Sequence, residues 1–167
     1  MDIIVASPTE LIFAGKTYSC VVGHGGIGIK AGEGDGITPV GRFPLRSLRY
    51  RPDLINKPKT QLTTRPITPL DGWCDDPTHA QYNRPIRLPF NASHENLWRS
   101  DTLYNVIVDL GFNDDPPVPG LGSAIFFHVK SPESSPTEGC VALAQSDLIE
   151  VLQNCHADTF MDIKPQF

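Results

Sequence analysis

His128 precedes Cys140 by twelve positions, and an imidazole and a thiol together can support nucleophilic catalysis. An imidazole near a thiol lowers the pKa of the thiol or removes its proton, which turns the sulfur into a nucleophile. His128 ends the apolar run 124–127, which is typical of a buried strand, and Gly139 directly precedes the cysteine. The flexible backbone of a glycine would let successive N–H groups point at a developing oxyanion. On residue types alone, a core histidine and an inert buried cysteine explain the pair equally well.

Two motifs resemble a known enzyme family. The first is Phe127-His128 followed by the Thr-Glu-Gly-Cys-Val run at 137–141. It resembles the catalytic signature of the L,D-transpeptidases, the YkuD-type enzymes that cross-link peptidoglycan. The second motif is Lys-Ala-Gly-Glu-Gly-Asp-Gly-Ile-Thr-Pro-Val-Gly-Arg-Phe at 30–43, which is similar to the family's Gly-Asp-Gly-x-Thr-Pro-x-Gly-x-Phe stretch. The motifs occur in the family's order, and the likeness spans roughly residues 18–155.

The resemblance implies a fold and a mechanism. The fold would be mostly β, a YkuD-like sandwich or flattened barrel with one main helix near the C-terminus, and residues 1–167 would form a single catalytic domain. Cys140 would be the nucleophile and His128 the base, oriented by a main-chain carbonyl, while backbone N–H groups of Gly139 and Cys140 would hold the oxyanion. The substrates would be peptidoglycan stem peptides, one as acyl donor and one as acceptor. They would be joined through a cysteine thioester into 3→3 or 1→3 cross-links.

Two residues depart from the family's pattern. Many members have His before the glycine and Arg or Asn two places after the cysteine, whereas this chain has Glu138 and Ala142. A carboxylate that faced the sulfur would raise the pKa of the thiol. We favour the other placement, in which Glu138 faces the cleft and contacts the donor or acceptor peptide. The Thr-Glu-Gly-Cys-Val-Ala-Leu form resembles a proteobacterial subgroup, some members of which are associated with 1→3 cross-links.

Two other functions are compatible with these residues. A hydrolase on the same fold, an L,D-carboxypeptidase or endopeptidase, would use the same pair with water in place of the amine. A non-catalytic wall-binding module would need neither side chain, so the presence of both His128 and Cys140 disfavours it.

Residues 71–100 are predicted to form a peptide-binding cover over the sheet. They are rich in aromatic, amide and cationic side chains, which would pack the aliphatic arms of a stem peptide and bind its carboxylates. Tyr82, Asn83 and Arg84 are the favoured substrate contacts, because the resemblance places a similar tripeptide before a strand. Asn113 is a further candidate, since the strand after it delivers the histidine. Ordinary loop and edge positions would explain the same residue types.

Apolar and turn residues predict the elements that carry these side chains. Strands are expected at 2–6, 10–13, 17–23, 104–110, 124–128 and 160–163. Pro132 and Pro136 predict a loop that folds the cysteine back toward the imidazole. The segment 44–70 has five prolines and is expected to be an irregular surface segment or an edge strand rather than a binding patch. Ser146 is predicted to cap a helix at 146–154.

Composition excludes several classes of function. Apolar residues make up 40% and charged residues 20% of the chain, which is typical of a globular protein. A net charge of −5 argues against nucleic-acid binding, which needs a basic patch. The four cysteines lack metal-site spacing and the five histidines are scattered, so no metal and no other cofactor is expected. Cys74 and Cys155 are expected to be free thiols rather than a disulfide, and the protein is expected to be a monomer.

The N-terminus leaves the location open. No stretch approaches the roughly eighteen apolar residues of a membrane span. Residues 1–8 lack the basic and apolar regions of a signal peptide. A peptidoglycan enzyme would act in the periplasm or cell envelope, so the chain would start after processing or follow another export route. A cytoplasmic location is the alternative.

Overall fold

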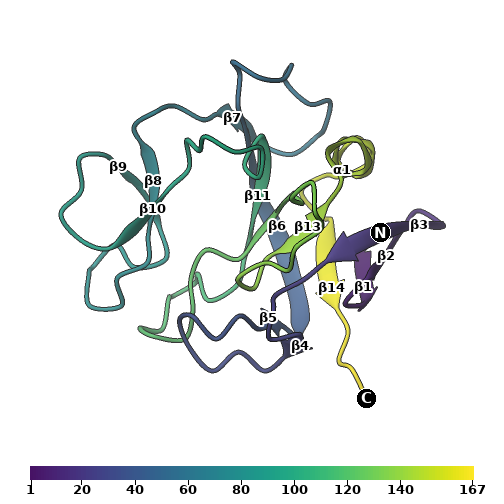
Figure 1. Ribbon diagram of the computed structural model, residues 1–167, viewed down its shortest axis with the longest axis horizontal. Helices are drawn as coiled ribbons and strands as arrows, with labels where there is room; N and C mark the ends of the chain where they lie inside the picture. The colour runs from purple at the N-terminus through teal and green to yellow at the C-terminus, as the bar shows by residue number, and fades with distance from the viewer.

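A nine-stranded sheet dominates the computed structural model, which describes residues 1–167 (Figure 1). Its strands lie in the order β11-β12-β13-β3-β2-β1-β14-β6-β7, and β11 also pairs with β6, so the sheet closes into a barrel-like structure. The strands are β1 (Ile3–Ser7), β2 (Glu10–Phe13), β3 (Lys16–Val21), β6 (Gly41–Tyr50), β7 (Thr64–Pro66), β11 (Val106–Leu110), β12 (Phe126–Val129), β13 (Val141–Leu143) and β14 (Phe160–Ile163). The expected mostly β fold with one main helix is confirmed.

Two small sheets and one helix complete the fold. The first small sheet has the order β10-β8-β9, with β8 (Asp71–Cys74), β9 (Pro85–Arg87) and β10 (His94–Asn96). The second pairs β4 (Ile27–Gly28) with β5 (Thr38–Pro39). The helix α1 (Gln145–Leu152) and the β8–β10 sheet lie on opposite sides of β6 and β11 in Figure 1. No helix in the chain has the length and apolar character needed to cross a bilayer.

Two apolar clusters form the core, and neighbouring residues of one strand contribute to both. In β12, Phe127 and Val129 belong to the larger cluster, which also includes buried residues of α1. Phe126 belongs to the smaller cluster, together with Trp73 of the β8–β10 sheet. Because side chains alternate across a strand, His128 lies on the same face of β12 as Phe126. This face is the one that meets the β8–β10 sheet.

Several expected elements agree with the structure to within a few residues. The strands at 10–13 and 160–163 have the expected bounds, and the ends of the others are shifted by at most two residues. Residues 71–100 contain a small sheet where only a cover was expected. Cys74 and Cys155 are free and buried, as are the other two cysteines.

Two local predictions were wrong. Residues 44–50 belong to β6, a ten-residue strand that pairs with β14, β11 and β7 inside the main sheet. The prediction of an irregular surface segment or an edge strand was therefore wrong for 44–50, where Leu45 and Leu48 are buried and anchor the strand. It agrees with residues 51–70, which are irregular apart from β7 at one end of the sheet order. The helix begins at Gln145 with Ala144 as its N-cap, so Ser146 lies inside the first turn and makes no capping hydrogen bond. Packing of Leu148 and Leu152 against the sheet replaces the cap as the source of helix stability.

Candidate active site

The pairing of β12 with β13 brings His128 and Cys140 together. The two strands run parallel, with Phe127 opposite Val141 and His128 opposite Ala142. Cys140 comes immediately before β13, so the parallel register sets the cysteine beside Phe126 at the start of β12. Both side chains line a cleft of about 630 Å³, a volume typical of ligand sites. The loop prediction for the intervening segment is consistent with this arrangement.

The His128 ring is held by the main chain. Its Nδ1 donates a hydrogen bond to the Val129 carbonyl over 2.8 Å, which leaves Nε2 as the proton-accepting nitrogen. The ring of Tyr104 stands edge-on to it, with the ring centroids 5.5 Å apart. Burial lowers the pKa of His128 to about 4, and the positive charge of Arg99 acts in the same direction. At neutral pH the imidazole is therefore uncharged and able to accept a proton.

The Cys140 sulfur is buried and contacts backbone atoms of the strand that carries the histidine. The Phe126 N–H donates to Sγ over 3.3 Å, and the thiol lies 3.4 Å from the Ala124 carbonyl, to which it can donate. Burial raises the pKa of Cys140 to about 12, against the opposing effect of the Phe126 N–H, and the charge of Glu95 raises it further. The resting site therefore contains a neutral thiol and a neutral imidazole.

Gly139 has a conformation that few other residues adopt. Its φ is +134°, and a Cβ at this position would lie 3.0 Å from the Ile37 carbonyl oxygen. Its N–H donates to Thr137 Oγ1 over 3.1 Å, so this N–H is already engaged. The Cys140 N–H makes no hydrogen bond within the protein. Of the two donors expected at the oxyanion, the structure leaves the Cys140 N–H free.

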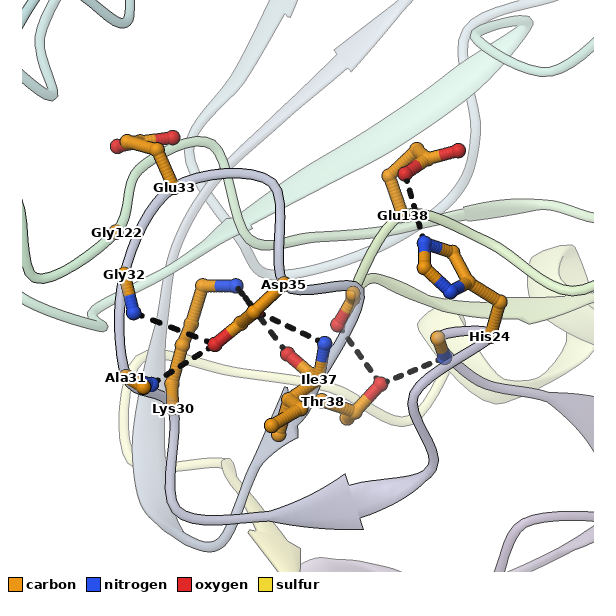
Figure 2. A network of polar contacts seen from close by, with 12 residues as sticks. His24, Lys30, Ala31, Gly32, Glu33, Asp35, Ile37, Thr38, Gly122 and Glu138 are labelled. Atoms are coloured by element: carbon orange, nitrogen blue, oxygen red, sulfur yellow. Dashed lines mark hydrogen bonds and ion pairs between the residues drawn. The ribbon is translucent and has the colours of Figure 1, made fainter.

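Thr38 connects the glycine-rich segment 23–37 to the cysteine loop (Figure 2). Its hydroxyl accepts a hydrogen bond from the Gly23 N–H over 2.8 Å and donates one to the Gly139 carbonyl over 2.9 Å. A Cβ on Gly23 would lie 1.9 Å from the Gly36 carbonyl oxygen, so only glycine fits there. The second sequence motif therefore supports the backbone of the first.

Lys30 and Asp35 brace the same segment from within (Figure 2). The ammonium group lies 2.5 Å from an Asp35 oxygen, and the carboxylate also accepts hydrogen bonds from the N–H groups of Ala31, Gly32 and Ile37. Burial alone would raise the pKa of Asp35, but the hydrogen bond from Lys30 and those from the backbone together lower it to about 2. Lys30 also lines the cleft, although its side chain is only 4% exposed.

Glu138 lies at the rim of the cleft and interacts with His24. Its carboxylate is 3.1 Å from His24 Nε2, and Figure 2 shows the two side chains pointing toward each other. The Glu138 side chain is 86% exposed, so it remains accessible to a bound peptide. Among the groups that act on the thiol, Glu138 is the weakest of those that raise the pKa of Cys140. This placement favours the cleft-facing role, which stays a prediction.

The four other expected substrate contacts do not line this cleft. Asn83 uses its whole side chain internally: Oδ1 accepts from Trp73 Nε1 and the Ala124 N–H, and Nδ2 donates to the carbonyls of Phe112 and Asn113. These bonds hold the chain just before β12. A contact between Asn83 and substrate stays a prediction, but the geometry assigns it a supporting role.

Tyr82, Arg84 and Asn113 also lie outside the cleft. The Tyr82 hydroxyl bonds Glu33 and accepts from the Gly122 N–H, and Asn113 bonds the backbone of its own loop at Val118 and Gly122. Arg84 lines a separate cavity of about 160 Å³. Their expected contacts with substrate stay predictions.

The cleft contains charged residues that the sequence reasoning did not single out. The walls carry both cations and carboxylates: besides Glu138, they are Lys30, Arg99 and Lys130, and Glu33, Asp75 and Glu95. Such a mixed lining suits a ligand that carries both charges. The sequence shows that residues 71–100 and the second motif are rich in charged residues. That composition does not indicate which of the charged side chains face the cleft. Nowhere do three or more His, Cys, Asp or Glu side chains gather as a metal site requires, and the absence of a cofactor stays a prediction.

Comparison with protein families gives one match. A family model described as YkuD, the L,D-transpeptidase catalytic domain, matches residues 3–163. Neither the curated proteins nor the solved structures contain a match to the chain.

Proposed function

The chain belongs to the YkuD family of L,D-transpeptidase catalytic domains, which are peptidoglycan enzymes, and on this premise we propose that it joins stem peptides through a thioester on Cys140. The observation that carries the proposal is the shared cleft. A neutral imidazole with a free Nε2 and a buried thiol both open onto it. A base and a nucleophile in the correct protonation states are what cysteine acyl transfer requires.

The first step of the proposed reaction forms the acyl-enzyme. His128 Nε2 takes the proton of the Cys140 thiol while the sulfur attacks a carbonyl of the donor peptide. The Cys140 N–H is the free backbone donor that would stabilise the oxyanion. His128 then gives its proton to the leaving amine, so the imidazole is neutral again once the thioester has formed.

The second step transfers the acyl group to an amine. The side-chain amine of a second stem's diamino acid attacks the thioester carbonyl, the C–S bond breaks, and the thiol is restored. Water in place of the amine would give a trimmed peptide, which is the hydrolase reaction. The bond formed would be a 3→3 or a 1→3 cross-link, and residues 137–143 resemble a subgroup of which some members are associated with the 1→3 type.

The remaining features of the proposal follow from the family. Because these enzymes act on the cell wall, we propose that the protein works at the periplasm or cell envelope. We further propose that residues 1–167 work as one catalytic domain and as a monomer.

Incubation with defined muropeptides followed by mass analysis tests the proposal. We expect a cross-linked product with wild type and none with Cys140→Ala, while Cys74→Ala retains most of the activity. His128→Ala should slow acylation of the cysteine roughly 10²–10⁴-fold, the usual loss for a positioned base, and His156→Ala should not. A carbapenem should add its mass to Cys140. Cross-linking by Cys140→Ala would end the proposal, and trimmed peptides alone would identify a hydrolase.

A further inference from the structure

Glu95 is a carboxyl group in the cleft that the two-step reaction described above does not use. It lies on β10, partly buried, and lines the same cleft as His128 and Cys140. The hydroxyl of Tyr104 donates a hydrogen bond to its Oε1, while Oε2 makes no hydrogen bond. Glu95 forms no ion pair, because the nearby Arg99 is engaged by Asp101 at 2.7 and 2.9 Å. An ionised carboxylate in a largely buried position costs folding free energy unless a positive charge or a hydrogen-bond donor pairs with it.

The position of Glu95 is unfavourable for the first step of the reaction. Its negative charge raises the pKa of the Cys140 thiol, so the group opposes formation of the thiolate. Tyr104, which Glu95 bonds, packs edge-on against both His128 and Phe126. The carboxylate is therefore near the reacting atoms, and its benefit must lie in another step.

We propose that Glu95 binds the ammonium group of the acceptor and takes a proton from it, so that a neutral amine attacks the thioester. The inference rests on the proposed function, since it assigns the second substrate of that reaction. An ammonium group supplies the positive partner that Oε2 lacks. Aliphatic amines are almost fully protonated near neutral pH and cannot attack until a proton is removed.

The protons balance in this scheme. One N–H proton of the ammonium moves to Glu95, and the amine nitrogen forms a bond to the thioester carbonyl carbon. A second N–H proton passes through His128 Nε2 to the sulfur as the C–S bond breaks. The amide keeps the third N–H, the thiol of Cys140 is restored, and Glu95 releases its proton to solvent as the product leaves.

The surroundings of Glu95 suit a proton acceptor. Burial raises the pKa of Glu95, and a carboxylate with a raised pKa is a stronger base than an exposed one. The charge of Asp75 also raises this pKa, while the bond from Tyr104 and the charge of Arg99 lower it. The groups that act on the Glu95 carboxyl are Tyr104, Arg99 and Asp75, and Asp101 pairs with Arg99. His94, His128 and Cys140 line the same cleft.

The experiment measures acylation and transfer separately in the Glu95→Gln variant. The glutamine amide can still accept the Tyr104 hydroxyl bond but can neither pair with an ammonium group nor take its proton. Carbapenem acylation of Cys140, followed by intact mass, reports the first step. Transfer from a muropeptide donor to an acceptor with a diamino-acid side-chain amine reports the second, with the N-acetylated acceptor as a blank. Glu10→Gln, on the exposed edge of β2, is the matched charge control.

We expect acylation in Glu95→Gln to be as fast as in wild type or faster, and transfer to the amine to fall roughly 10²-fold, with hydrolysis of the acyl-enzyme retained. The transfer rate of Glu95→Gln should rise about tenfold per pH unit from 7 to 9, because only the neutral amine reacts. Wild type should vary much less over this range. Glu95→Asp, which keeps the carboxylate, should keep the shallow pH profile at a lower rate.

Three results would overturn the inference while leaving the proposed function intact. The first is a transfer rate in Glu95→Gln equal to that of wild type. The second is an equal loss of acylation and transfer in that variant. The third is a Tyr104→Phe variant that shows the same steep pH profile of transfer as Glu95→Gln. The last two would mean that Glu95 only positions Tyr104 and the histidine. If wild-type Cys140 forms no acyl-enzyme with either a carbapenem or a muropeptide, the proposed function fails and this inference fails with it.

Discussion

At the scale of single residues, burial controls the chemistry of the site. Two groups that form an ion pair in many cysteine enzymes are both neutral here, since desolvation lowers the pKa of His128 to about 4 and raises that of Cys140 to about 12. A neutral pair reacts only when proton transfer and attack on a carbonyl occur together. The thiol is thereby protected from reagents that need a free thiolate.

The first prediction concerns the pH dependence of this thiol. Because its pKa in the folded protein is about 12, the thiolate fraction should rise tenfold per pH unit throughout the range 6–9. Alkylation of Cys140 by iodoacetamide, followed by peptide mass mapping, should therefore accelerate with pH and reach no plateau. A plateau near pH 7 would reveal a stable thiolate and contradict the neutral pair.

Glu138 provides the second prediction. Since its carboxylate is paired with His24 at the cleft rim and has little effect on the thiol, Glu138→Gln should raise the KM for a peptidoglycan fragment and leave the pH profile of Cys140 alkylation almost unchanged. The control is Glu133→Gln, an exposed position in the loop before the cysteine motif. A lowered thiol pKa with an unchanged KM would show that Glu138 acts on the sulfur.

At the scale of elements, the cysteine loop is held by a distant part of the chain. The parallel pairing of β12 with β13 fixes the position of Cys140, which lies just before β13. The segment 23–38 supports the cysteine loop through Thr38 and through a bridge between Gly23 and Thr137. Glycine adopts the positive φ of residue 139 at little cost, and these contacts hold the loop in that one conformation. The two sequence motifs therefore form one structural unit.

The third prediction tests that unit. Thr38→Val keeps the side-chain shape but leaves the Gly23 N–H and the Gly139 carbonyl without their partner. We expect a loss of about 1–3 kcal/mol in the free energy of unfolding, measured with urea, because both groups are buried. Carbapenem acylation of the cysteine should also slow. Thr17→Val, on an exposed position of β3, is the matched control, and an equal loss in both variants would contradict the role of Thr38.

At the scale of the whole molecule, the cleft lies at the boundary between two cores. Cys140 and Phe126 belong to the smaller apolar cluster under the β8–β10 sheet, while their neighbours Val141 and Phe127 belong to the larger one. The candidate nucleophile is thus held by packing on both sides. The walls of the cleft come from segments that are far apart in the chain, including Lys30 and Glu95.

The fourth prediction concerns acid unfolding. Asp35 has a pKa of about 2 in the folded protein, below the value of about 3.9 in an unfolded chain, so its contribution is complete above pH 4 and disappears as pH falls toward 2. Asp35→Asn should lower the free energy of unfolding by about 2 kcal/mol at pH 7, and the difference from wild type should shrink between pH 4 and 2. Urea unfolding across this range measures it, with Asp158→Asn, an exposed position, as control. A difference that is constant with pH would exclude the ionised carboxylate as the cause.

Features that depend on neighbouring residues were predictable from the sequence. The alternating and continuous apolar runs predicted β2, β12 and β14, because strand periodicity is a local property. The family-like motifs at 127–128 and 137–141 pointed to His128 and Cys140 as the candidate base and nucleophile. Two local signals gave wrong predictions. Prolines at 44–70 suggested an irregular segment or an edge strand, although 44–50 belong to β6 inside the main sheet, and Ser146 was predicted to be the N-cap although the N-cap is Ala144. In both places tertiary packing outweighed the local preference.

Only the tertiary structure decided which side chains face the cleft. The tripeptide at 82–84 had the residue types of a peptide-binding site, but the hydrogen bonds of Asn83 turn inward and support the chain before β12. Glu95 and Lys30 line the cleft because the β8–β10 sheet and the glycine-rich segment both contribute to its walls. Burial then set the pKa values of His128 and Cys140. Register, burial and the direction of a side chain depend on pairings between distant segments, and no local pattern of residues records them.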